Sequence, residues 1–173
     1  MARAPATAWA GILMMLVVAP LTGQNAGPAP VKIAVFNFEL DDQSPSAALL
    51  NQGPNRATTL EKATSEARRE LAQSGRYQVI DASQVDIHAV PGKALRNCGG
   101  CEVGLALQLG ADQALVGVIT SATQTDYYVA IQIRDAHSGK LLNQQEANFA
   151  GSEEGWPSGV RMLIKHQLLV PQE

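Results

Sequence analysis

The sequence predicts an α/β (α+β) fold, a mixed β-sheet of about five strands with about three helices packed on it. Runs of β-branched and aromatic residues alternate with segments of helical periodicity, which is typical of strand–helix–strand units with parallel strands. Two later strands follow one another through a short turn, as in an antiparallel hairpin. The length left after the first apolar segment suits a single domain.

The first 26 residues have the pattern of a secretory signal peptide. Arg3 precedes an apolar run over residues 8–19, and Pro20 ends it. This run is shorter than the roughly 20 apolar residues that a helix needs to cross a membrane. We therefore expect export and cleavage after about Ala26, a linker over 27–30 and a single periplasmic domain over 31–170, with no stable membrane span after processing. An uncleaved membrane anchor is the alternative.

Two strands and a helix make up the first half of the predicted domain. Residues 31–40 form the first strand, with Ile33, Val35 and Asn37 on one face, and a long loop follows over 41–55. A helix capped by Thr58 or Thr59 continues to Ser74. Its apolar side is formed by Leu60, Ala63, Ala67 and Leu71. Gly75 ends this helix, and a second strand occupies residues 76–81.

The second half begins with a loop and a short helix and continues as a meander. The predicted elements are a loop over 83–97, a helix over 102–109, a central strand over 112–120, a strand over 127–134, a hairpin turn over 135–140, a strand over 141–150 and a helix over 156–169. The strand over 112–120 is apolar on both faces, which indicates cover on two sides. The strand over 141–150 is rich in Asn and Gln, so we place it at an edge.

Cys98 and Cys101 form a C-x-x-C motif at the start of the short helix. In an oxidising compartment such a pair normally forms a disulfide, and we predict a structural bridge that staples the entrance of the helix. A helix N-terminus also lowers the pKa of a thiol, so a redox-active pair is an alternative. Metal ligation is a third alternative. Zinc sites usually have four Cys or His ligands, and besides the two cysteines the sequence offers only histidines that lack paired spacing, namely His88, His137 and His166.

Other patterns argue against common catalytic and binding classes. A net charge of −3 is unsuited to nucleic acid, which requires clustered cations, so we expect no nucleic-acid partner. The sequence has no G-x-G-x-x-G and no assignable Ser-His-Asp order. We interpret the adjacent acids Asp41–Asp42 and Glu153–Glu154 as solvated, and Trp156 as a core anchor with a partner-binding aromatic as the alternative. No catalytic residue, cofactor or metal site is predicted.

Several segments together resemble a family of exported proteobacterial proteins known only as a domain of unknown function. They are Lys32–Glu39 (KIAVFNFE), Cys98–Glu102 (CGGCE), Leu109–Asp112 (LGAD), Val116–Val118 (VGV), and Ser152 with Trp156. The layout, including the hairpin Arg134–Gly139 (RDAHSG), is more remotely similar to the N-terminal domain of the Tol-Pal periplasmic protein and to the periplasmic domain of the curli secretion lipoprotein. This chain has no lipid-bearing Cys and no room for a β-propeller or a barrel-forming segment.

The resemblance implies a periplasmic domain that binds other proteins and transfers no catalytic residue. We therefore expect a non-enzymatic periplasmic accessory or protein-binding module whose partner is a periplasmic or envelope protein. Its candidate surfaces are the loop over 41–55 and the edge strand over 141–150. The alternative is a periplasmic thiol-disulfide oxidoreductase, with Cys98 as attacking thiolate and Cys101 as resolving thiol.

Overall fold

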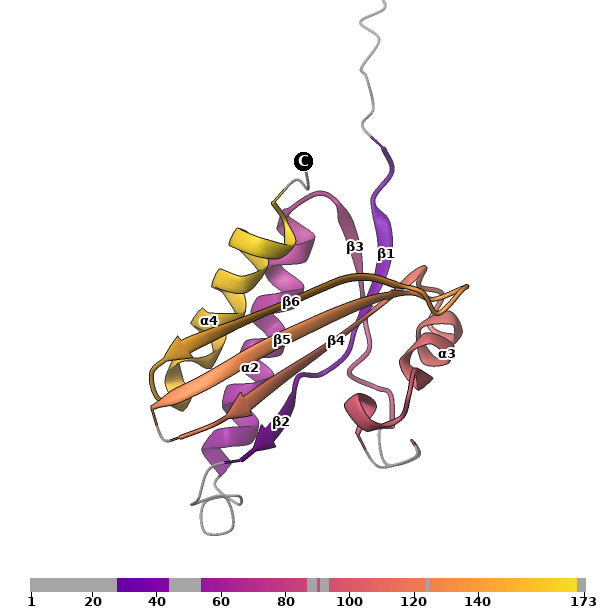
Figure 1. Ribbon diagram of the computed structural model, residues 1–173. Helices are drawn as coiled ribbons and strands as arrows, with labels where there is room; N and C mark the ends of the chain where they lie inside the picture. Colours follow the sequence, from indigo (N-terminus) through magenta and orange to yellow (C-terminus); the bar gives the residue numbers. More distant parts are fainter. Residues whose placement is uncertain (1–27, 44–53, 87–89, 91–93, 124, 171–173) are drawn as a thin grey trace, which may run out of the picture.

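A computed structural model describes residues 28–43, 54–86, 90, 94–123 and 125–170 of the chain (Figure 1). The predicted signal peptide, residues 1–26, lies outside this part. The elements are β1 (Val31–Val35), β2 (Glu39–Asp42), α2 (Pro54–Gln73), β3 (Tyr77–Asp81), a 3₁₀ turn (Leu95–Asn97), α3 (Cys101–Gln108), β4 (Gln113–Ser121), β5 (Asp126–Asp135), β6 (Leu141–Ala150), a second 3₁₀ turn (Glu153–Gly155), α4 (Trp156–Leu163) and a π-helical turn (Ile164–Leu168). None of the described helices is both long and apolar enough to cross a membrane.

The strands form one mixed sheet in the order β3-β1-β4-β5-β6, with β2 also paired to β4. The pairs β1–β3, β1–β4 and β2–β4 are parallel, whereas β4–β5 and β5–β6 are antiparallel. The predicted fold class is confirmed, and β4 is central as expected. The sheet has six strands instead of about five because the expected first strand is divided in two.

That division is a one-residue bulge between β1 and β2. Val35 lies opposite Leu115 in β4, whereas Glu39 lies opposite Val118, so one extra residue is inserted on the β1–β2 side. The insertion reverses the alternation of side chains: Asn37 is exposed and Phe38 is buried. The sequence predicts Asn37 on the face of Ile33 and Val35; in the structure Asn37 is exposed, its Oδ1 accepts a hydrogen bond from Arg68 of α2 at 3.0 Å, and it is not part of their buried core.

A side chain of α2 stabilises the bulge. The Phe38 N–H donates to Thr64 Oγ1 at 2.9 Å, which gives this amide a partner where the ladder with β4 is interrupted. The Phe38 ring fits over Gly117 of β4, where an added Cβ would lie 2.3 Å from the ring. Only glycine admits the aromatic ring at this approach.

Helix α2 begins at Pro54, earlier than the predicted cap at Thr58 or Thr59. Proline suits a first helical turn because its missing N–H would have no partner there. Thr59 is inside the helix, and its hydroxyl donates to the Asn55 carbonyl oxygen at 2.8 Å. The predicted loop over 41–55 is thus shorter at both ends, since Asp41 and Asp42 belong to β2, and its residues 44–53 lie outside the described part.

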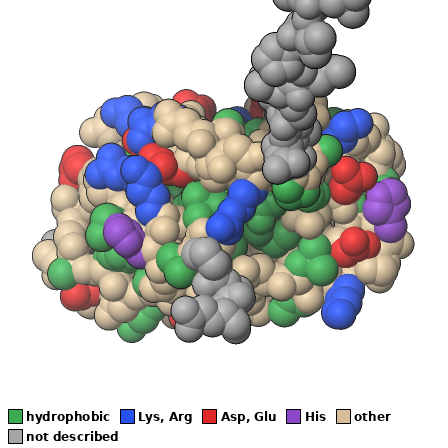
Figure 2. Space-filling model, turned by 90° about the horizontal axis from the view of Figure 1, so that it is seen from above, with side chains coloured by type: hydrophobic (Ala, Val, Ile, Leu, Met, Phe, Trp, Pro, Cys, Tyr) green, Lys and Arg blue, Asp and Glu red, His purple; other side chains and the backbone are tan. Residues whose placement is uncertain are grey.

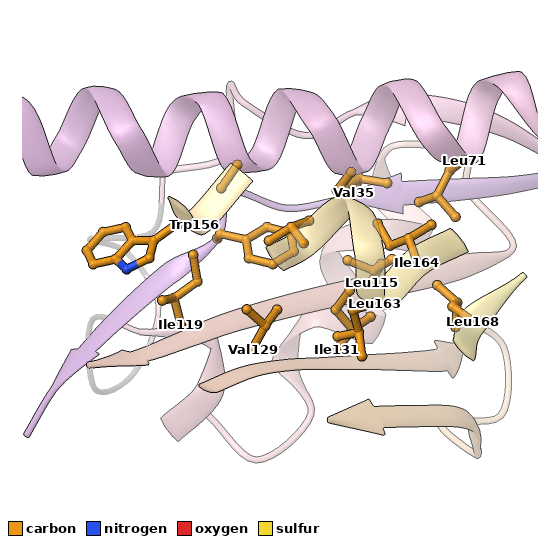
Figure 3. Packing of buried hydrophobic residues seen from close by; sticks show 14 of the residues in the cluster. Val35, Leu71, Leu115, Ile119, Val129, Ile131, Trp156, Leu163, Ile164 and Leu168 are labelled. Carbon is orange, nitrogen blue, oxygen red and sulfur yellow. The ribbon is translucent and has the colours of Figure 1, made fainter. Parts of the chain in front are cut away.

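Helices cover the two faces of the sheet unequally (Figure 1). Helices α2 and α4 pack together on one face, over a core that runs from Trp156 and Ile119 at one end to Leu168 at the other (Figure 3). Trp156 is 1% exposed, which confirms its interpretation as a core anchor. The apolar side predicted on α2 is confirmed too: Ala63, Ala67 and Leu71 are fully buried, and Leu60 is partly buried against the same core.

Helix α3 covers the other face near its edge with a smaller core. Small side chains predominate in it, among them Ala34, Ala82, Ala106, Ala111, Ala114 and Ala136. Alanines let the helix backbone approach the sheet closely. Helix α3 has 8 residues against the 20 of α2, so it reaches over less of the sheet. Among the described residues, nothing covers the face of β4, β5 and β6 beyond α3, and Tyr128 there is 38% exposed.

The hairpin between β5 and β6 is held by Asp135. Its Oδ1 accepts the N–H groups of His137 at 3.1 Å and Ser138 at 2.7 Å, and Gly139 takes the left-handed φ of 71° that the turn requires. The pKa of Asp135 is lowered, mostly by the hydrogen bonds that it accepts from Ser138 and to a smaller extent by the one from His137. This geometry explains the Arg-Asp-x-x-Ser-Gly pattern seen in the sequence.

Candidate functional site

The C-x-x-C motif forms a closed turn at the start of α3. Cys98 and Cys101 are joined by a disulfide, and the two glycines between them take left-handed φ values of 68° and 108°. Such φ values are costly for other residues, which gives Gly99 and Gly100 a physical role. The Cys101 N–H donates to Cys98 Sγ at 3.2 Å. The backbone of the helix start therefore faces the first sulfur of the motif.

The residues near the disulfide do not favour a metal centre. Cys98 and Cys101 share their sulfurs with each other, so neither is a thiolate ligand in this state. The neighbouring carboxylate of Glu102 pairs with Arg134 Nε at 3.1 Å. His137 lies at the hairpin, 3.4 Å from Asp112 Oδ1, His166 is exposed on the π-helical turn, and His88 lies outside the described residues.

A hollow of about 440 Å³ borders the C-x-x-C turn. Its lining comes from the 3₁₀ turn and the C-x-x-C turn, from the start of α3, from β4 and β5, and from the β5–β6 hairpin: Leu95, Arg96, Gly99, Gly100, Glu102, Val103, Val116, Gln132, Arg134 and Gly139. Arg96 pairs with Glu39 at 3.0 Å, as Arg134 does with Glu102, so both guanidinium groups have partners. The hollow continues over Val118 and Ala130 onto the open face of the sheet. An open, mixed surface of this kind suits contact with another molecule better than enclosed chemistry.

A second hollow, of about 590 Å³, lies where the described chain begins. Seen from above, hydrophobic side chains gather in the middle of this end of the molecule (Figure 2). Pro28 and Ala29 of the predicted linker line the hollow, together with residues of β1 and the α2–β3 turn. The linker itself therefore forms part of the wall.

A cluster of charges that the sequence did not predict joins three distant segments. Arg56 of α2 donates to Asp42 of β2 and to Glu153 of the second 3₁₀ turn. The side chains of Arg56 and Asp42 are only 9% and 3% exposed. Burial opposes the charge on Arg56, but the two carboxylates outweigh it and raise its pKa. The interpretation of Asp42 as a solvated acid is therefore wrong, whereas the Glu153 side chain pairs with Arg56 and is still 31% exposed.

Strand β6 lies at an edge of the sheet, as predicted, and among the described residues no strand pairs with its outer side. The Gly151 N–H donates to the Thr125 carbonyl oxygen at 2.7 Å. This bond shows which residues of β6 direct their backbone N–H and C=O groups toward β5. Odd-numbered residues of β6 therefore bond to β5, and even-numbered ones point their N–H and C=O groups outward. The outward residues Gln144, Glu146 and Asn148 are exposed.

This edge lacks the features that usually block edge strands. Over Leu141–Ala150 there is no Lys, Arg or Pro, and Glu146 is the one charged residue. A bulge occurs opposite Ile133 and Arg134, but the register from Asn143 to Ala150 is regular. Natural edge strands commonly carry lysine, proline or bulges that prevent pairing, so β6 is unusually open to another strand.

The family model DUF3280, described as a protein of unknown function (DUF2380), matches residues 31–168. The chain belongs to this family. The resemblance to a family of unknown function that the motifs indicated is thereby confirmed. No curated protein matches this DUF3280 chain.

Several solved structures are similar to this DUF3280 chain at low identity. The PelC dodecamer from Paraburkholderia phytofirmans is 18% identical with a TM-score of 0.52, covering 85% of this chain and 94% of that one. The LpoB C-terminal domain from Salmonella enterica is 15% identical with a TM-score of 0.47 (72% and 86% covered). TolB from Acinetobacter baumannii is 16% identical with a TM-score of 0.45 (80% and 28% covered). The likeness to PelC concerns the fold alone.

Proposed function

We propose that this DUF3280 protein is an exported, non-enzymatic periplasmic module that binds other proteins through the outer edge of β6. The observation that carries the proposal is the unblocked edge itself, with its regular run of outward backbone groups from Gln144 to Ala150. An extended segment that adds to such an edge gains main-chain hydrogen bonds without burying a charged side chain other than Glu146.

The periplasmic location is supported by the signal-like first 26 residues and by the disulfide in the C-x-x-C turn, which suits an oxidising compartment. PelC, which has the same fold, was solved as a dodecamer. From this likeness we infer for this chain only that its fold is suited to association between proteins. A periplasmic or envelope protein is the expected partner.

The role of the β6 edge in binding is tested by removing one of its outward backbone N–H groups. Asn148→Pro removes an outward N–H without removing a hydrogen bond to β5, whereas Asn148→Ala keeps the N–H and removes the amide side chain. We expect proteins captured from periplasmic extract by the wild-type chain and by Asn148→Ala to be lost with Asn148→Pro. Equal capture by all three chains would contradict the proposal, provided that circular dichroism shows the same fold for each.

A thiol-disulfide oxidoreductase is the second candidate, because the Cys101 N–H faces Cys98 Sγ and would stabilise a thiolate there. Reduced Cys98 would attack a sulfur of a substrate disulfide, and Cys101 would then displace the substrate as a dithiol, leaving the pair oxidised. Insulin reduction that requires both cysteines, together with an acidic Cys98 thiol, would favour this candidate. A bridge that resists glutathione and shows no such activity would exclude it.

A further inference from the structure

We infer that β6 pairs antiparallel with β6 of a second copy of the chain, so that two sheets join into one across a two-fold axis. This inference rests on the proposed protein-binding function and names the strand that the edge accepts. It follows from the side chains of β6, from the register that they permit and from the direction of its free backbone groups.

The side chains of β6 suit a strand identical to itself. Asn143, Gln144, Gln145 and Asn148 are amides, and each amide offers both donors and an acceptor. Two equal amides facing each other across a two-fold axis can therefore hydrogen-bond, whereas two equal charges would repel. An edge adapted to a partner of opposite charge would carry several charges, but β6 carries only Glu146. This composition favours a second copy over a charged peptide.

The register follows from symmetry. Residues opposite each other in an antiparallel pair lie on the same face, so the two-fold axis has to pass through a residue and not between two. The two registers that come nearest to full overlap of Leu141–Ala150 with itself place either Gln145 or Glu146 on the axis and leave one end residue unpaired. Placing Glu146 there would set two carboxylates directly opposite each other, which destabilises a strand pair. The axis therefore passes through Gln145.

In this register two of the exposed residues, Gln144 and Glu146, become a complementary pair. Gln144 lies opposite Glu146 of the second copy, and symmetry repeats this pair on the other side of the axis. Both residues point their backbone groups outward, as the alternation from Gly151 requires, so they form the hydrogen-bonded pairs of the new ladder. Their side chains lie on the open face, opposite Gln132 and Ala130 of β5, away from α2 and α4.

Charge variants at Gln144 test both the second copy and its register. Gln144→Lys places an ammonium opposite each Glu146 and is expected to tighten dimerisation, whereas Gln144→Glu places two carboxylates opposite each other and is expected to weaken it. Because each contact occurs twice, the change in the dimer dissociation constant is roughly two- to thirtyfold in either direction. Gln73→Lys and Gln73→Glu make the same charge changes at an exposed position of α2 and serve as matched controls.

Sedimentation equilibrium measures the dimer dissociation constant of the processed chain. The measurement is made at physiological salt and over a wide range of protein concentrations. A wild-type dimer that Gln144→Lys tightens, Gln144→Glu weakens and the Gln73 variants leave unchanged supports the inference. A monomer at every concentration, or equal shifts at Gln144 and Gln73, overturns it. Partner capture that is still lost with Asn148→Pro would then preserve the proposed function, so the two failures are distinguishable.

Discussion

Single arginine side chains connect parts of this protein that are far apart in the sequence. Arg56 joins β2 to the turn before α4, Arg134 joins β5 to α3, and Arg68 donates to the Val35 carbonyl oxygen at 2.9 Å beside the bulge. These contacts could not be predicted from the sequence, because the partners have no fixed spacing and long side chains reach them only in the folded chain. Burial of the apolar residues of α2 was predictable, since helical periodicity is a local property.

Replacing Arg56 by Met is expected to lower the free energy of unfolding by about 3 kcal/mol, because it removes the guanidinium from the buried Asp42 carboxylate. Lys62→Met on the same helix is the control, since Lys62 is exposed, and its effect should stay within about 0.5 kcal/mol. Denaturant unfolding of both variants gives the comparison. An Arg56 variant as stable as the control would show that the cluster contributes nothing.

Among the elements, those with a clear period were predictable and those with an insertion were not. The strand–helix–strand unit, the central β4 and the edge β6 agree with the prediction because each has a consistent pattern over its length. The bulge between β1 and β2 was missed although the sequence carries a sign of it, since the apolar positions change from odd (Ile33, Val35) to even (Phe38, Leu40). Its cause is tertiary, namely the bond from Phe38 to Thr64 and the room that Gly117 leaves.

The contact between Phe38 and Gly117 gives a prediction at the level of the strands. Gly117→Ala should destabilise the protein by about 1–3 kcal/mol, because the new Cβ would lie within 2.3 Å of the ring. Gly104→Ala in α3 meets no atom within 4 Å and should stabilise by about 0.5–1 kcal/mol. Thermal unfolding distinguishes the two. Adding Phe38→Leu to Gly117→Ala should recover part of the loss, and no recovery would refute the steric explanation.

At the level of the whole molecule, fold class and family were predictable from the sequence, whereas the binding surface was predictable only in part. The edge position of β6 followed from its polar composition. The direction of its backbone groups did not, because it depends on the register with β5. The hollow beside the C-x-x-C turn also had no sequence signal, since its lining comes from three separate segments.

We propose that export and disulfide formation occur together. The chain isolated from the periplasm should lack about the first 26 residues and contain no free thiol, whereas residues 27–173 made in the cytoplasm should carry two alkylatable cysteines. Intact mass after alkylation under denaturing conditions measures both. An exported chain that keeps its first residues would disprove cleavage, and one with free thiols would disprove the structural disulfide.

The extra residue at the β1–β2 bulge also matters for how relatives of this chain are aligned. Beyond Asn37, positions that face α2 and α4 have the opposite parity from those before it. A relative without the insertion would place its aromatic one position earlier to fill the same space over Gly117. An alignment with such a relative should therefore carry its gap at Asn37, and a homology model built without that gap would place the side chains after Asn37 on the wrong faces of the sheet.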